Sequence, residues 1–87
     1  MTDIYRAPQR TLDGIRRYVN DRIPPGHFLT AVLSNDLRGA FSRADDENRA
    51  AMFAIVSYCY NEIPGACWGS PEAVGEWLDG IESGASE

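Results

Sequence analysis

The chain has 87 residues, of which 44% are apolar, so it can build one small hydrophobic core and hence one domain. Its net charge of −5 and its pI near 4.7 disfavour nonspecific attraction to phosphate backbones, and no direct nucleic-acid binding is expected. The sequence has no apolar run of the ~18 residues that a membrane span needs and no signal-peptide layout, so no membrane association is expected.

The first predicted element is a helix over residues 11–21, preceded by an N-terminal arm of residues 1–10 that shows no helical period. Thr11 is the candidate N-cap of this helix. The prolines at 24–25 end it, because proline has no amide hydrogen to donate. Its apolar stripe consists of Leu12, Ile15 and Val19.

A second helix is predicted from residues 25–27 to Ser42, and two polar residues interrupt its apolar stripe. At 100° per residue, Asp36 falls inside the apolar arc and Asn35 lies at its edge. A carboxylate directed at a core must be paired, hydrogen-bonded or protonated, so Asp36 is either a structural anchor or part of a ligand site. As an anchor it would pair with an arginine of the first helix: Arg16, Arg17 or Arg22.

Two further helices complete the predicted domain. The third is capped by Asp45 or Asp46 and runs to about Asn61, and its wide apolar arc places it in the middle of a bundle. The fourth begins at Ser70-Pro71-Glu72, where serine caps the helix and proline fits its first position. With a disordered tail predicted at 83–87, the expectation is an all-α, compact four-helix domain with short loops over residues 11–82.

The loop before the last predicted helix carries the other candidate binding residues. Backbone amides at a helix start such as Gly69 and Ser70 can bind anions, and Arg16 or Arg17 could complete a phosphate pocket; ordinary capping is the simpler interpretation. Trp68 in this loop could contribute to an aromatic surface for a ligand or partner, or it could plug the end of the bundle.

The sequence offers no catalytic constellation, and the prediction is a protein that is not an enzyme. His27 is the only histidine and the two cysteines lack CxxC spacing, so no metal site and no cofactor are expected. Cys67 could be a nucleophile with His27 as its base, but nothing in the sequence brings them within hydrogen-bond reach. Two thiols are too few for a secreted disulfide framework, which favours a cytosolic protein.

Two segments carry a resemblance to a known group of proteins. They are PPGHFLTAVLSNDL at residues 24–37 and WGSPEAVGEWL at residues 68–78, with Arg-Ala-Asp at 43–45 between them. Over residues 15–78 the chain resembles small accessory proteins of tailed phages and prophages. The resemblance implies a protein of the host cytoplasm that acts by binding rather than by catalysis.

Three functions stay open at this point. The favoured one is a stoichiometric inhibitor that uses its acidic surface against a host antiphage protein, such as a nuclease or a CRISPR component. The second is an oligomeric sponge that sequesters a small phosphorylated ligand, such as a nucleotide-type defence signal. The third is a structural or regulatory helical adaptor of the phage, in which Asn35 and Asp36 only fix helix packing.

Overall fold

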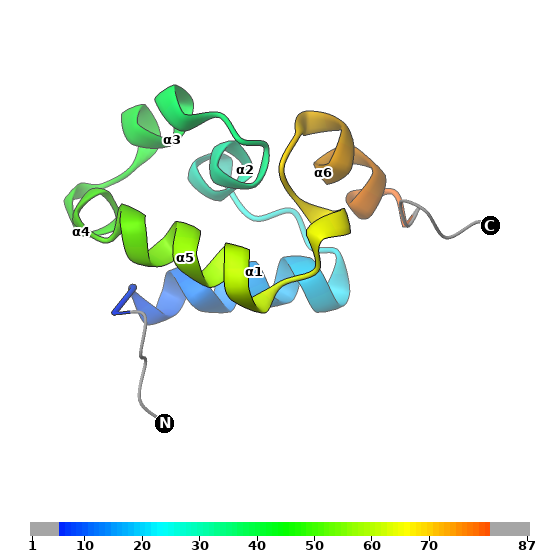
Figure 1. Cartoon of the computed structure of the whole chain (residues 1–87), viewed down its shortest axis with the longest axis horizontal. Helices are drawn as coiled ribbons and strands as arrows, with labels where there is room; N and C mark the ends of the chain where they lie inside the picture. Colours follow the sequence, from blue (N-terminus) through cyan, green and yellow to red (C-terminus); the bar gives the residue numbers. More distant parts are fainter. Residues whose placement is uncertain (1–5, 81–87) are drawn as a thin grey trace.

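Six α-helices and one 3-10 turn succeed one another along residues 6–80, the part of the chain that the computed structural model describes (Figure 1). They are α1 (Gln9–Asp21), α2 (His27–Leu33), α3 (Leu37–Arg43), α4 (Asp46–Ala50), α5 (Met52–Glu62), η1 (Gly65–Cys67) and α6 (Pro71–Leu78). No strand occurs in this range, so the predicted all-helical class is confirmed. The predicted count of four helices is wrong, because two of the expected helices are each divided into two. The tail predicted at 83–87 lies outside the described residues.

The second expected helix is divided where its two polar residues stand. Asn35 adopts the left-handed conformation (φ 64°), and its amide donates to the Val32 carbonyl at 3.1 Å while that of Asp36 donates to Ala31 at 2.8 Å. This double pattern is the Schellman motif, which closes α2, and asparagine tolerates its left-handed position. Asp36 then begins α3 by accepting from the Gly39 amide at 3.0 Å. The placement of Asp36 in the core stripe was wrong, since both side chains are exposed.

Replacing Asp36 by alanine will remove the N-cap of α3 and lower the free energy of unfolding by about 1 kcal/mol. Asp36→Asn is the matched control, because the amide oxygen can still accept from Gly39 and stability should stay close to wild type. Urea denaturation followed by circular dichroism measures both variants. Equal losses in the two would contradict the capping role.

The other predicted helix starts agree better with the structure. Asp45 caps α4 by accepting from the Asn48 amide at 2.8 Å, and Ser70 caps α6 by accepting from Ala73 at 3.0 Å. A break at Ala51 divides the third expected helix into α4 and α5. The first helix begins at Gln9 rather than at Thr11, with Pro8 at its N-cap position. Thr11 is therefore not a cap, and it lies buried in the first turn of α1.

The core is assembled around α2, which packs against α1, α3 and α6 (Figure 1). Seven side chains are almost completely buried there: Tyr18, Leu12, Ile15, Leu33, Ile55, Cys59 and Cys67. Tyr18 joins α1 to the C-terminal segment, because its hydroxyl donates to the Cys67 carbonyl at 2.8 Å and its carbonyl accepts from Trp77 Nε1 at 3.0 Å. Arg22 lies 4.0 Å from the centre of the Trp77 ring and donates to the Trp77 carbonyl at 3.2 Å. Trp77 is thus a core residue, as its helical period predicts.

Candidate functional site

The residues predicted as a site fall in three places, and the first is a small groove between α3 and α5. Asn35, Asp36 and Trp68 line this groove of about 150 Å³, together with apolar residues of α3 and α5. Asn35 and Asp36 reach it as the exposed turn between α2 and α3, while Trp68 is half-buried against the core. The structure thus brings these three together, although they come from segments about thirty residues apart.

Gly69 and Ser70 lie beside this groove, and the Gly69 amide, a predicted anion donor, is already in use. The Gly69 amide donates to the Leu33 carbonyl at 2.7 Å, which ties the loop to the end of α2. Gly69 has φ 110°, a conformation that residues with a side chain rarely adopt. The Ser70 hydroxyl accepts from Ala73 as the cap of α6. These contacts match the capping interpretation of this helix start.

Arg16 and Arg17 follow one another on α1 but have different surroundings. Arg16 Nε donates to the hydroxyl of the buried Tyr58 at 3.2 Å, and Arg16 Nη1 pairs with Asp13 at 3.1 Å. The hydrogen bond to Tyr58 raises the pKa of Arg16 above its ordinary value. The expected ion pair between Asp36 and an α1 arginine is wrong, because the Asp36 carboxylate instead accepts from the amide of Gly39. Arg17 lines a different pocket.

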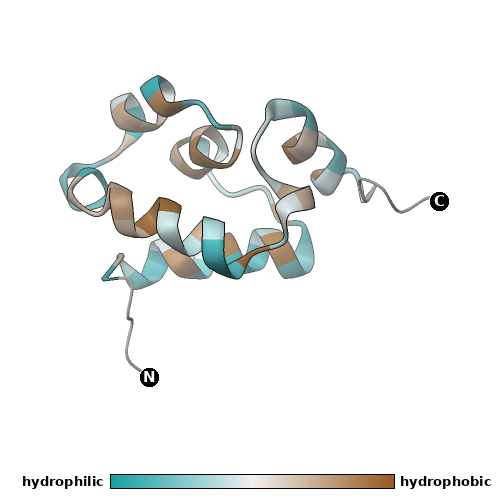
Figure 2. Cartoon of the chain, viewed as in Figure 1, coloured by the Kyte–Doolittle hydropathy of each residue, from teal (hydrophilic) through white to brown (hydrophobic). Residues whose placement is uncertain are grey.

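An exposed apolar face, which the sequence does not predict, lies on α3 and α5. Five large apolar side chains of α3 and α5 remain accessible, and they are Leu37, Phe41, Phe53, Val56 and Tyr60. We call this set the α3–α5 face; Figure 2 shows apolar residues on the ribbons of both helices. Phe53 keeps 86% of its surface, Tyr60 79% and Leu37 65%, whereas ordinary core residues keep almost none.

The exposure of part of α5 shows that the prediction of this helix in the middle of a bundle was wrong. Ile55 and Cys59 are fully buried, but Phe53, Val56 and Tyr60 form a separate stripe that is open to solvent. Both stripes are apolar, so together they give the wide arc seen in the sequence. An apolar arc of this width is typical of a central helix, but here part of it is an uncovered surface.

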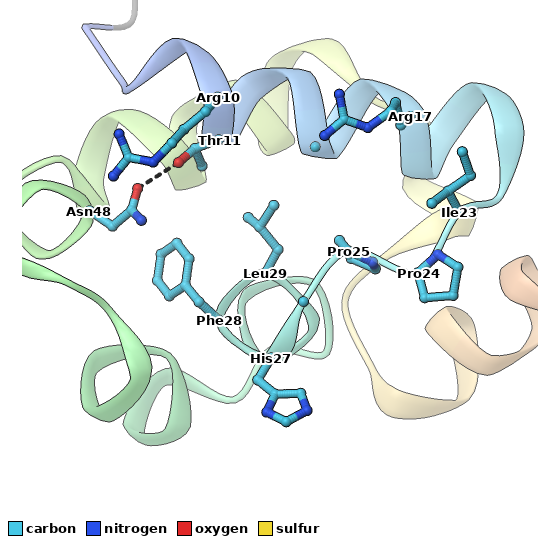
Figure 3. A pocket seen from close by; sticks show the side chains of 12 residues that line it. Arg10, Thr11, Arg17, Ile23, Pro24, Pro25, His27, Phe28, Leu29 and Asn48 are labelled. Carbon is cyan, nitrogen blue, oxygen red and sulfur yellow. Dashed lines mark hydrogen bonds between the residues drawn. The ribbon is translucent and has the colours of Figure 1, made fainter.

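The second hollow lies between α1 and the segment that leads into α2 (Figure 3). Its volume is about 420 Å³, and residues 23–29 form one wall. Arg17 and Arg10 extend from α1 along the opposite wall, and Asn48 closes one end. The ring of His27 is directed away from Arg17. Of the residues predicted as a site, this pocket contains Arg17 alone.

The two thiols are buried and protonated. Burial raises the pKa of Cys59 to about 12 and that of Cys67 to about 11. Cys67 Sγ donates to the Pro64 carbonyl at 3.1 Å, while His27 is exposed on α2. In the described range, 6–80, no group of three His, Cys, Asp or Glu side chains comes together as metal ligands would. No helix of residues 6–80 has the length and apolarity to cross a bilayer.

Comparisons of the chain with models of protein families, with curated proteins and with solved structures give no match. The α3–α5 face, the groove and the pocket beside α1 are therefore the features of the chain that bear on its function.

Proposed function

We propose that this chain is a binding protein without catalytic activity, whose partner protein covers the α3–α5 face. The observation that supports this proposal is the exposure of five large apolar side chains on two adjoining helices. Single exposed apolar residues are ordinary, but a contiguous set of this kind is typical of an interaction surface. Leu37 and Val56 line the same groove, so the two helices contribute to one continuous surface.

The more specific proposal is a phage accessory protein that inhibits a host antiphage protein in the host cytoplasm. It is supported by the resemblance of residues 24–37 and 68–78 to phage accessory proteins and by the acidic character of the chain. A net charge of −5 favours a partner with a basic rim, because opposite charges accelerate encounter and fix orientation.

The α3–α5 face has the composition that dominates binding energies in known interfaces. Aromatic side chains are enriched among the residues whose truncation weakens a complex most. Burying a large apolar side chain that is otherwise exposed contributes about 1.5–3 kcal/mol. Phe53 and Tyr60 are the two most exposed members of the face, so they are the expected anchors.

Replacing Phe53 and Tyr60 together by serine should weaken binding of the partner by about 100-fold or more, because about 3 kcal/mol of apolar burial is lost. Both side chains are exposed, so the fold should persist, as circular dichroism will check. Ile23→Ser is the matched control, since Ile23 is an exposed apolar residue away from α3 and α5. The assay is capture of host proteins by the three immobilised forms, followed by titration of the captured protein at two salt concentrations.

The proposal requires a stoichiometric partner that the wild type and Ile23→Ser retain, that the double variant loses, and that binds more weakly as salt rises. Capture that the double variant leaves unchanged would overturn the assignment of the face. Light scattering on the free protein provides the other arm. A homo-oligomer that becomes a monomer in the double variant would mean that a second copy covers the face, which contradicts the inhibitor proposal.

A further inference from the structure

The pocket between α1 and residues 23–29 has an unusual polar end. Asn48 retains only 8% of its surface, and its Oδ1 accepts a hydrogen bond of 2.6 Å from the hydroxyl of the equally buried Thr11. A side-chain amide also carries two N–H donors on Nδ2. Within residues 6–80 these donors have no hydrogen-bond partner, and Figure 3 shows the nitrogen turned away from Thr11 into the pocket.

An unsatisfied buried donor is costly, which makes the orientation of Asn48 informative. Leaving such a group without an acceptor costs about 1–3 kcal/mol, so buried polar groups in proteins are nearly always paired. Two hydrogen bonds hold Asn48 in place: its Oδ1 accepts from the Thr11 hydroxyl, and its main-chain amide donates to the Asp45 carboxylate. The amide is therefore positioned to donate to an acceptor that occupies the pocket.

The two arginines on the opposite wall differ in availability. Arg10 is occupied, because its guanidinium donates to Glu47 at 2.7 Å and to Asp45 at 2.8 Å. The Arg17 guanidinium makes no hydrogen bond or ion pair with any residue between 6 and 80, and it lines the pocket alongside Gly14. A free guanidinium presents paired donors that match the geometry of carboxylate and phosphate groups.

The remaining walls of the pocket are apolar and would suit a flat, apolar part of a ligand. Phe28 and Leu29 line the pocket from α2, and Pro24 and Pro25 line it from the preceding turn. Ligand pockets typically combine such apolar walls with a few polar groups that fix orientation. The volume of about 420 Å³ lies within the range of small-molecule sites.

We propose that this pocket binds a small ligand in which an oxyanion is attached to a flat, largely apolar body. Arg17 holds the oxyanion, the Asn48 amide donates to an acceptor of the ligand, and the body lies against Phe28 and Leu29. The site is separate from the α3–α5 face, so it can exist whether or not the proposed protein partner does.

Phenyl phosphate is the probe, because it joins an oxyanion to a flat ring, and inorganic phosphate is the comparison without a ring. In ¹H–¹⁵N NMR spectra, the Asn48 side-chain amide and Arg17 Nε–H signals should move together and saturate with phenyl phosphate at about 1–10 mM. Arg17→Gln should weaken this binding by about tenfold or more, since a charged hydrogen bond is lost. Arg16→Gln is the matched control and should leave the affinity unchanged, because Arg16 contacts Asp13 and Tyr58 instead.

Three results would overturn the proposal. The first is that the Asn48 amide signals do not move when phenyl phosphate is added, which would mean that this donor binds only water. The second is that inorganic phosphate binds as well as phenyl phosphate and moves the Arg17 signal alone, which would identify surface attraction of an ion. The third is that Arg16→Gln weakens binding as much as Arg17→Gln, which would indicate an effect of net charge. None of them bears on the α3–α5 face, whose test uses a different surface and a different partner.

Discussion

Replacing Trp77 by alanine will lower the free energy of unfolding by about 3–5 kcal/mol, the range measured for truncation of large buried aromatic side chains. Trp77 keeps 8% of its surface and donates from Nε1 to the Tyr18 carbonyl. Its ring also lies under the Arg22 guanidinium at 4.0 Å. A domain of 87 residues has a total stability of about 4–13 kcal/mol, so a loss of this size removes at least about a quarter of it.

Two further substitutions serve as comparisons, one at the same position and one at the other tryptophan. Trp77→Phe keeps a ring for packing and for Arg22 but loses the donor to Tyr18, so it should cost less than alanine. Trp68→Ala removes a tryptophan that is only half-buried, and it should cost less than Trp77→Ala. Urea denaturation followed by circular dichroism measures all three. A loss below about 1 kcal/mol for Trp77→Ala would contradict the central position assigned to this ring.

The second large effect is a loss of stability in alkaline solution. Burial raises the pKa of Cys59 to about 12 and of Cys67 to about 11, both above the ordinary value of 9.0. Above pH 9 the unfolded chain releases these protons while the folded chain keeps them, so stability falls as the pH rises toward the folded-state values. Between pH 8 and pH 10 the two thiols together should cost about 2–3 kcal/mol.

A variant with both cysteines replaced by alanine is the control for this pH dependence. It should start from a lower stability, because two buried side chains are shortened, but it should lose much less between pH 8 and pH 10. Burial also raises the pKa of Tyr18, which extends the loss to higher pH in both proteins. Denaturation curves at several pH values, recorded with a reductant, provide the measurement. Parallel losses in wild type and variant would show that the thiols are not the cause.

The helix starts could be predicted because their signals are local. Asp45 and Ser70 cap the helices that follow them, and each interaction involves residues only three positions apart. The boundary between α2 and α3 was missed because the apolar period continues across it from Val32 to Ala40. Asn35 and Asp36 carried the necessary signal, since asparagine often ends a helix and aspartate often begins one. The apolar period places these residues in the core, whereas their types favour helix ends, and in the structure they end α2 and begin α3.

The candidate sites could be predicted only in part, because they depend on tertiary packing. Trp68 was predicted either to contribute to an aromatic surface or to plug the end of the bundle, whereas its position beside Asn35 and Asp36 follows from the bond between Gly69 and Leu33. Periodicity cannot tell an apolar stripe that faces the core from one that faces solvent, so the α3–α5 face had no distinct signature. Asn48 likewise had none, since its pairing with Thr11 joins residues 37 positions apart.

The bonds around Tyr18 also determine the order in which the chain can become stable as it is synthesised. Tyr18 leaves the ribosome with α1, yet its hydroxyl donates to Cys67 and its carbonyl accepts from Trp77, which lie 49 and 59 residues later. At about 5–20 residues per second, the ribosome needs about 3–12 s to supply them. During that interval the part of α1 around Tyr18 lacks these partners and is accessible to chaperones and proteases, until the segment that carries Cys67 and Trp77 has been made.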